Sequence, residues 1–179
     1  HILEEFFRVA LVRPGLSLTL YQHERILFKL NPGNTLQRIV ALFGDTYRER
    51  MLAVNLDTEQ FRLSGFIGKP AFARKTRGEQ YFFTNGRFIR HPYLHHSVLN
   101  AYQELIPDNA HPAYFLFMEV DPSTLDVNIH PTKTEVKFQD ERLVYGMMRS
   151  AVREALGRST AMPSIDFDVE QGFTLPPGS

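Results

Sequence analysis

The order of apolar and polar positions divides the chain into helices and short paired strands. Apolar residues recur at helical spacing over residues 2–12, 35–43 and 93–105, and again from about 140 to Gly157. Alternation typical of strands appears in short runs at 16–21, 26–30, 51–56, 61–67, 81–84 and 87–89. Asn85-Gly86 joins the last two runs and tolerates the positive φ of a type I′ turn, so these runs predict a hairpin.

One further run, 113–120, is apolar at nearly every position, as a central strand buried on both faces would be. Asp140 is a candidate N-cap for the last helix, and Gly157 is expected to end that helix. Mixed helices and strands in this order predict an α+β fold, a mixed β-sheet with helices packed mainly on one side. We expect one domain over residues 1–157 and a flexible linker or tail over 158–179, where the periodicity stops.

Composition excludes several kinds of crosslink and functional site. The chain has 179 residues, 43% of them hydrophobic, which is enough for a sizeable core. No cysteine is present, so disulfides, thiolate metal sites and a cysteine nucleophile are excluded. No run of ~18 apolar residues occurs, so no membrane span or membrane partner is predicted. The chain begins at His1 without a methionine, and we interpret it as a piece of a longer protein.

Charge is segregated although Lys+Arg and Asp+Glu both number 20. Between residues 62 and 90 the basic residues outnumber a single acid, whereas 100–127 holds acids and neither Lys nor Arg. A basic loop beside an aromatic hairpin fits contact with nucleic-acid phosphates without sequence readout. The alternative is a solvated loop whose cations face acids elsewhere. The candidate DNA-binding residues are Lys69, Arg74, Lys75, Arg77, Arg87 and Arg90.

Two other groups of residues invite a functional interpretation that we do not favour. His91 and His95 have the spacing of helical metal ligands, but Pro92 should start the helix and no carboxylate completes a set, so no metal site is predicted. Phe82, Phe83 and Phe88 could stack on bases, but aromatic residues in strands are more often core, and core is the prediction here. His130 lacks an associated nucleophile and is expected to shape its loop.

Residues 125–138 form the most informative stretch of the chain. Apolar and polar residues alternate from 125 to 129 and again from 136 to 138, and His130-Pro131 interrupts the alternation. The pattern predicts a strand, a tight loop and a short strand, with Lys133 near the apex of the loop. A lysine there is a compact charge that suits a phosphate oxygen, although a solvated surface lysine would give the same pattern.

The letters of residues 126–138, DVNIHPTKTEVKF, resemble the DVNVHP-x-K-x-EV-[KR]-F signature of the MutL family of DNA mismatch repair proteins. Ile129 stands in for a valine, and the other specified positions match. Residues 81–89 resemble the family's aromatic [FY]-V-N-G-R hairpin, and 112–122 resemble its P-[AV]-[FY]-x-L strand and DP turn. The resemblance covers residues 2–156. One departure is Pro92, where some members of the family carry a basic residue.

This resemblance implies the second, or transducer, domain of the N-terminal ATPase region, with a fold shared by gyrase-type ATPases and by the second domain of a small-subunit ribosomal protein. In the family, the lysine at the position of Lys133 contacts the γ-phosphate of ATP, so Lys133 is the catalytic candidate. ATP and Mg²⁺ are expected cofactors of the intact protein only. Expected partners are DNA, a MutS-type mismatch sensor and a second copy in a homodimer. In a bacterium the protein would be cytoplasmic and nucleoid-associated.

The same resemblance implies what this chain lacks. The glutamate, asparagine and glycine-rich segments that build the family's nucleotide pocket do not occur here, so the chain by itself is predicted to be inactive as an ATPase. One lysine cannot make a phosphate site without other donors. The alternative function is a nucleic-acid-binding α+β module of a topoisomerase or ribosomal type. A topoisomerase would place its lysine in a Gln-Thr-Lys setting, whereas this chain has His-Pro-Thr-Lys.

Overall fold

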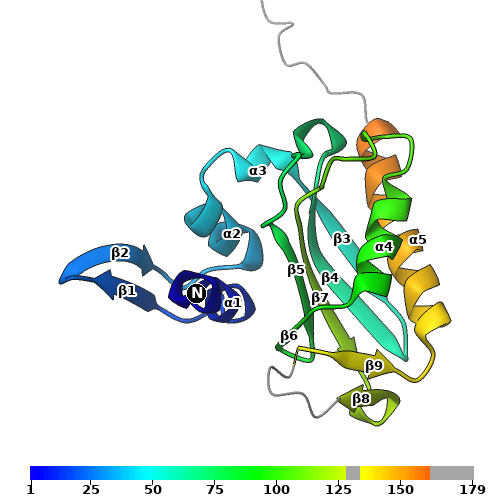
Figure 1. The fold of residues 1–179 in the computed structure, drawn as a ribbon, viewed down its shortest axis with the longest axis horizontal. Coiled ribbons are helices and arrows are strands. Elements are labelled where there is room, and N and C mark those ends of the chain that lie inside the picture. Colours follow the sequence, from blue (N-terminus) through cyan, green and yellow to red (C-terminus); the bar gives the residue numbers. More distant parts are fainter. Residues whose placement is uncertain (128–133, 162–179) are drawn as a thin grey trace, which may run out of the picture.

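The computed structural model describes residues 1–127 and 134–161. A five-stranded mixed sheet forms its centre, with the strand order β3-β4-β7-β5-β6. Strands β5 and β7 run parallel, and the other neighbours are antiparallel (Figure 1). This arrangement confirms the predicted mixed sheet and the α+β class. The strands are β3 (Met51–Asp57), β4 (Phe61–Gly68), β5 (Gln80–Thr84), β6 (Arg87–Ile89) and β7 (Tyr114–Val120).

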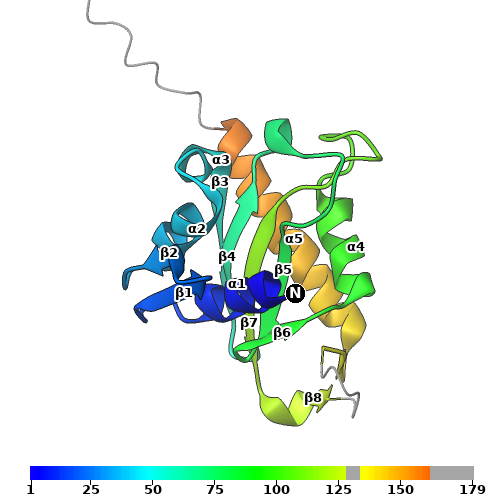
Figure 2. The same ribbon diagram turned by 60° about the vertical axis from the view of Figure 1, so that its left-hand side comes forward.

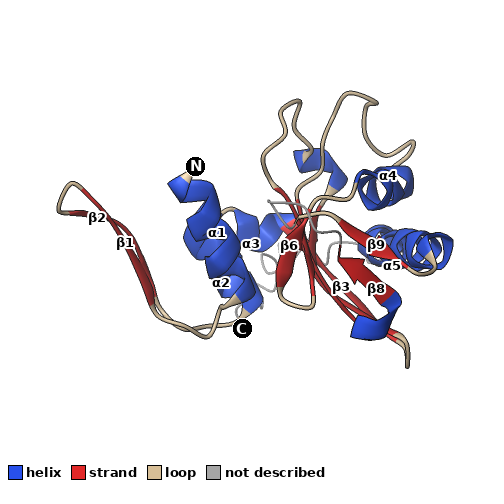
Figure 3. Ribbon diagram, turned by 60° about the horizontal axis from the view of Figure 1, so that its bottom comes forward, coloured by secondary structure: helices blue, strands red, loops and turns tan. Residues whose placement is uncertain are grey.

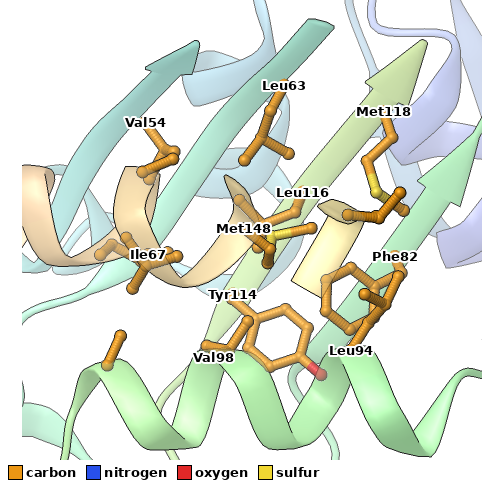
Figure 4. Packing of buried hydrophobic residues seen from close by; sticks show 14 of the residues in the cluster. Val54, Leu63, Ile67, Phe82, Leu94, Val98, Tyr114, Leu116, Met118 and Met148 are labelled. Atoms are coloured by element: carbon orange, nitrogen blue, oxygen red, sulfur yellow. The ribbon is translucent and has the colours of Figure 1, made fainter. Parts of the chain in front are cut away.

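Strand β7 is central, and its side chains are buried on both faces of the sheet, as its apolar sequence predicted. Tyr114, Leu116 and Met118 belong to the larger of two apolar clusters, which α4 (Pro92–Ala101) and α5 (Glu141–Ala161) cover. Figure 4 shows these side chains between the sheet and the two helices, together with Met148 of α5. The packing of α4 and α5 on one face matches the predicted position of the helices.

A second layer covers the opposite face, which the sequence analysis did not anticipate. It consists of α1 (Ile2–Val12), α2 (Thr35–Phe43) and the short helix α3 (Tyr47–Arg50) (Figure 1). The Phe43 ring lies 5.1 Å from the ring of Phe115, which is fully buried. A strand that is apolar on both sides needs a cover on each, because an exposed apolar face would cost the free energy of its hydration.

A buried arginine holds the segments of the second layer together. The side chain of Arg38 in α2 is 2% exposed and donates hydrogen bonds of 2.5–3.2 Å to five backbone carbonyls. The acceptors are the carbonyl oxygens of Ala10, Arg13, Pro14, Leu16 and Asn31. They lie at the end of α1, in the loop that follows it and after β2, so one guanidinium connects three segments of the chain.

A hairpin of β1 (Leu18–Gln22) and β2 (Arg25–Leu30) projects away from the sheet (Figure 3). The two residues of its turn, His23 and Glu24, have φ values of 48° and 64°, so this is a tight turn with the left-handed geometry that two-residue hairpins favour. The predicted hairpin is therefore confirmed. Near its base, Phe28 packs on Phe7 of α1 at 5.4 Å between ring centroids.

The predicted strand, loop and strand of residues 125–138 are confirmed at both ends. Strand β8 (Leu125–Val127) pairs antiparallel with β9 (Val136–Phe138), and the pair lies beyond the lower end of the main sheet (Figures 1 and 2). Lys133 and His130 lie between them, outside the described residues. Phe138 and Val136 belong to the cluster under α4 and α5, so the hairpin is anchored in the larger core.

Two predicted helix ends are wrong. Helix α4 ends at Ala101 rather than near residue 105: Tyr102 is its C-cap, and the backbone then turns through Glu104, whose φ is 72°. Helix α5 continues through Gly157 to Ala161. A glycine inside a helix costs only about 1 kcal/mol relative to alanine. Here the buried Ala155 and Leu156 on the preceding turn hold the helix on the sheet. Asp140 is confirmed as a cap, because its Oδ1 accepts from the N–H of Leu143 at 3.1 Å.

The contribution of the buried Arg38 side chain to stability can be tested by substitution. Replacing Arg38 by Met keeps much of the volume but leaves carbonyl oxygens without donors, so we expect a loss of about 3 kcal/mol or more in the free energy of unfolding. Chemical denaturation of the 179-residue chain measures this loss. Arg48→Met at an exposed position is the control and should change stability by less than about 0.5 kcal/mol. Equal stability of the two variants would contradict this role of Arg38.

Candidate nucleic-acid interface

The β5–β6 hairpin places its aromatic residues on both faces of the sheet. Phe82 packs against Tyr114 under α4, with ring centroids 4.6 Å apart, while Phe83 stacks on Phe117 at 5.0 Å on the other face. Both are buried, so the prediction that they are core residues is confirmed. Phe88 is half-buried and packs at the edge of the smaller apolar cluster, on the face that α1 and α2 cover. The hairpin tip is tied to β7, because the Asn85 side chain exchanges two hydrogen bonds of 3.0 Å with the backbone of Val120.

Two cavities are lined by residues of both α1 and this hairpin. The larger, of about 480 Å³, is lined by Arg77 and Arg90 among others. The smaller, of about 250 Å³, is lined by Arg87 and Thr134. Arg8 and Phe88 line both cavities. We call the two cavities together the α1–β6 trough.

Arg8 comes from α1 and is not among the residues predicted from the sequence. Its guanidinium carbon lies 4.0 Å from the centroid of the Phe88 ring, a cation–π contact. Its nitrogens also lie 2.9 Å from a carboxylate oxygen of Glu5 and 3.9 Å from one of Glu4. The spacing of these three residues predicts helix-surface pairs, but nothing local indicates that the arginine meets a ring some eighty positions along the chain, so that contact needed the tertiary structure.

The structure brings together three of the six candidate DNA-binding residues. Arg77, Arg87 and Arg90 line the trough, and none of them has an ion-pair partner among the described residues. Arg74 instead pairs with Glu79 at 3.1 Å, and its backbone forms an isolated β-bridge with His111. Arg74 thus faces an acid, as the alternative interpretation describes, while its side chain remains 53% exposed. Neither Lys69 nor Lys75 lines the trough.

Thr134, the first described residue after Lys133, also lies at this edge. Thr134, which follows Lys133 in the sequence, accepts a hydrogen bond of 2.9 Å from the backbone N–H of Arg90. The same threonine lines the smaller cavity beside Arg87. The described part of the β8–β9 hairpin and the basic end of β6 are thus joined directly.

Two histidine side chains lie next to this end of β6, at the start of α4. His91 caps α4, because its Nδ1 accepts from the N–H of Leu94 at 3.3 Å, and Pro92 is the first helical residue as predicted. Its Nε2 lies 3.5 Å from Glu141, a carboxylate that sequence spacing did not reveal, and its ring packs on Phe138 at 5.6 Å. Burial lowers the pKa of His91 below its usual 6.5, and Glu141 partly opposes that shift.

The second histidine, His95, bonds the Tyr114 hydroxyl through Nδ1 at 2.6 Å. Burial is the main cause that lowers the pKa of His95, and the positive charge of Arg77 acts in the same direction. In the described ranges, 1–127 and 134–161, no group of three or more His, Asp or Glu side chains is arranged to hold a metal ion. Within those ranges, none of the helices is long and apolar enough to cross a membrane.

The fold defines a class of protein: an α+β domain with a five-stranded mixed sheet and an apolar cluster on each face. A structure described as the N-terminal domain of a DNA repair protein superimposes with a TM-score of 0.74 at 19% identity, covering 90% of this chain and 54% of that chain. The ATPase domain of the Aquifex aeolicus mismatch repair endonuclease MutL superimposes with a TM-score of 0.55 at 20% identity, covering 87% and 50%.

Sequence comparison identifies the family. The family described as DNA mismatch repair protein, C-terminal domain, matches residues 39–157. The DNA mismatch repair protein MutL of Phocaeicola vulgatus is 47% identical over 170 residues, and that of Christiangramia forsetii is 45% identical over 176 residues. The chain belongs to the MutL family of DNA mismatch repair proteins. It covers 27% and 28% of the lengths of these two relatives, and 95% and 98% of the chain is matched.

The buried histidines make stability depend on pH. Folding lowers the pKa of both histidines below 6.5. Below that pH the unfolded chain binds more protons than the folded chain, so the free energy of unfolding decreases until the pH has fallen through the folded pKa. We expect the temperature of the thermal unfolding midpoint to decrease when the pH is lowered from 7.5 to 5.5. The decrease should be smaller in the double variant His91→Asn/His95→Gln. His23→Asn, in the exposed turn, should keep the parental difference. An undiminished difference in the double variant would contradict the assignment.

Proposed function

We propose that this chain is the part of a MutL protein that contacts the γ-phosphate of ATP through Lys133 and couples nucleotide state to domain closure around DNA. The observation that carries the proposal is the match of residues 126–138 to the MutL signature in a chain that belongs to the family. ATP and Mg²⁺ would bind to the intact protein, where other segments complete the pocket. This chain supplies one cation to that pocket.

The link from nucleotide to DNA would run through the β8–β9 hairpin. Phe138 of β9 is packed in the core under α4 and α5, and Thr134 is bonded to the N–H of Arg90. A shift of the segment that carries Lys133 would therefore act on the end of β6, where Arg87 and Arg90 lie. Such coupling requires two arrangements of a packed element that nucleotide and DNA each favour differently.

DNA binding would be independent of sequence. Arg77, Arg87 and Arg90 come from a loop and a strand end, and their charges are not neutralised by described carboxylates. Guanidinium groups in that setting suit backbone phosphates, which carry no base identity. The proposed partners of the intact protein are chromosomal DNA in the cytoplasm, a MutS-type mismatch sensor and a second copy of the protein.

A general nucleic-acid-binding module of the topoisomerase or ribosomal type was the alternative function. Membership of the MutL family favours mismatch repair over it. The His130-Pro131-Thr132-Lys133 setting of the lysine favours the same choice.

The role of Lys133 is tested in the longer protein. We expect Lys133→Ala to lower ATP turnover by about 100-fold, because a preorganised charge on the transferred phosphate is lost, while the fold is kept. Lys137→Ala, an exposed position on β9, is the control and should retain most of the turnover. Full turnover by Lys133→Ala, or equal turnover by the 179-residue chain alone, would refute the proposed role.

DNA contact is tested by charge reversal. Replacing Arg77, Arg87 and Arg90 together by Glu should weaken binding of single-stranded DNA and reduce the slope of log affinity against log salt by about 2. Reversing Lys69, Arg74 and Lys75 should have a smaller effect, because Arg74 is already paired with Glu79. The control reverses three exposed arginines elsewhere, Arg48, Arg142 and Arg153. If all three variants lost affinity equally, net charge alone would explain binding.

A further inference from the structure

Strand β3 forms one edge of the main sheet, and in the described ranges, 1–127 and 134–161, it pairs with β4 alone. The backbone N–H of Lys69 donates to the carbonyl of Arg50 at 2.8 Å, which shows which residues face β4. Successive residues of a strand direct their backbone groups to alternate sides. The residues whose backbone groups face β4 are therefore Leu52, Val54 and Leu56, and the outward residues are Met51, Ala53 and Asn55.

This edge has few of the features that keep a sheet edge from pairing with another strand. Proline, a bulge, an inward-pointing charge or a covering segment usually blocks such pairing. Residues 52–56 include neither a proline nor a charge, and they pair with β4 without a register shift. The outward carbonyl of Ala53 accepts a hydrogen bond from Arg158 of α5 at 3.3 Å, which is an exposed contact. A backbone N–H can replace that donor.

The two faces of β3 differ in polarity. Leu52 and Leu56 pack against the larger apolar cluster, on the face that α5 covers, but both are only partly buried. Ala53 and Asn55 lie on the opposite face and are exposed. A strand added beside β3 would extend the cluster if its apolar side chains lay on the first face and its polar side chains on the second.

The chain beyond α5 contains one run with this pattern. The helical periodicity ends with α5, but in residues 164–170, SIDFDVE, apolar and polar side chains alternate. Ile165, Phe167 and Val169 are the apolar members, and three acids lie between and after them. The run has seven residues, as β3 has. It lies outside the described residues.

The end of α5 places this run within reach of the edge. Figures 1 and 2 show the end of α5 beside the start of β3, and Arg158 in the last helical turn contacts Ala53. From Ala161, the last residue of α5, the chain spans about 10 Å to residue 164 when extended. Charge favours the same contact, because the run holds acids and no base, while Arg48 and Arg50 directly precede β3.

We propose that residues 164–170 add to the edge of β3 as a sixth strand, parallel to it. The direction follows because α5 ends beside the start of β3, so a chain that turns back onto the edge runs in the direction of β3. Ile165, Phe167 and Val169 would lie on the face of Leu52 and Leu56. The N–H and C=O groups of the outward residues would then be paired, as in other cases of strand addition.

The added strand would change where the rest of the chain leaves the domain. It would carry the chain from the end of α5 to the opposite end of the sheet, near the β8–β9 hairpin (Figure 1). Residues after 170 would start there, roughly 20 Å from the end of α5, because a strand of this length spans that distance. The inference does not depend on the proposed roles of Lys133 or of the DNA-binding arginines.

Amide hydrogen exchange in the 179-residue chain, followed for each residue by NMR, tests the added strand. We expect the amides of Ala53 and Asn55 to exchange about tenfold more slowly in the parent chain than in Ile165→Ser/Phe167→Ser. Phe173→Ser, in the same tail but outside the run, is the matched control and should keep the parental rates. The amide of Val54, which faces β4, should exchange slowly in every variant and shows that each is folded.

A spin label tests the direction of the strand. The chain has no cysteine, so Gln171→Cys, directly after the run, carries a single label. We expect this label to broaden the amide signal of Asp57, at the end of β3, more than that of Met51, at its start. A label at Ser179→Cys is the control and should favour neither signal.

Three outcomes would overturn the proposal. The first is exchange of the Ala53 and Asn55 amides in the parent chain as fast as in Ile165→Ser/Phe167→Ser. The second is protection that disappears when the protein is diluted, because a second copy would then occupy the edge. The third is stronger broadening of Met51 than of Asp57, because the run would then not lie parallel to β3.

Discussion

The arrangement of the whole edge depends on the buried guanidinium of Arg38. Its hydrogen bonds reach the end of α1, the following loop and the segment after β2, so it holds the second layer together from inside. A buried charge is tolerated only where donors and acceptors match, and here one planar group donates to five backbone carbonyls. Because α1 is held in this way, Arg8 lies over Phe88.

Strand β7 supplies the second constraint, since both of its faces are buried. One face carries α4 and α5, and the other carries α1 and α2, so the β5–β6 hairpin beside β7 touches both layers. The trough opens where α1 approaches β6. The β8–β9 hairpin meets the same edge through Thr134 and Arg90. Segments distant in the sequence thus meet at one place.

Much of the fold was predictable because its signals are local. The helices at 2–12 and 35–43 and the turn at Asn85-Gly86 follow from periodicity and from backbone preferences that act within a few residues. The signature around Lys133 is equally local and indicated the family before any contact was known. The helix ends were less predictable, because at Gly157 packing of the flanking residues outweighs the intrinsic cost of a glycine.

The sequence by itself therefore determined the elements, the α+β class and the family to which the chain belongs. Only the tertiary structure decided that Arg74 is paired while Arg77, Arg87 and Arg90 are not, that Glu141 faces His91, and that Arg8 joins the basic edge. The physical reason is the distance along the chain over which each signal acts. Periodicity records which side of an element is buried, but the partner of a charge is set by segments that approach through space, and a count of charges along the chain does not contain that information.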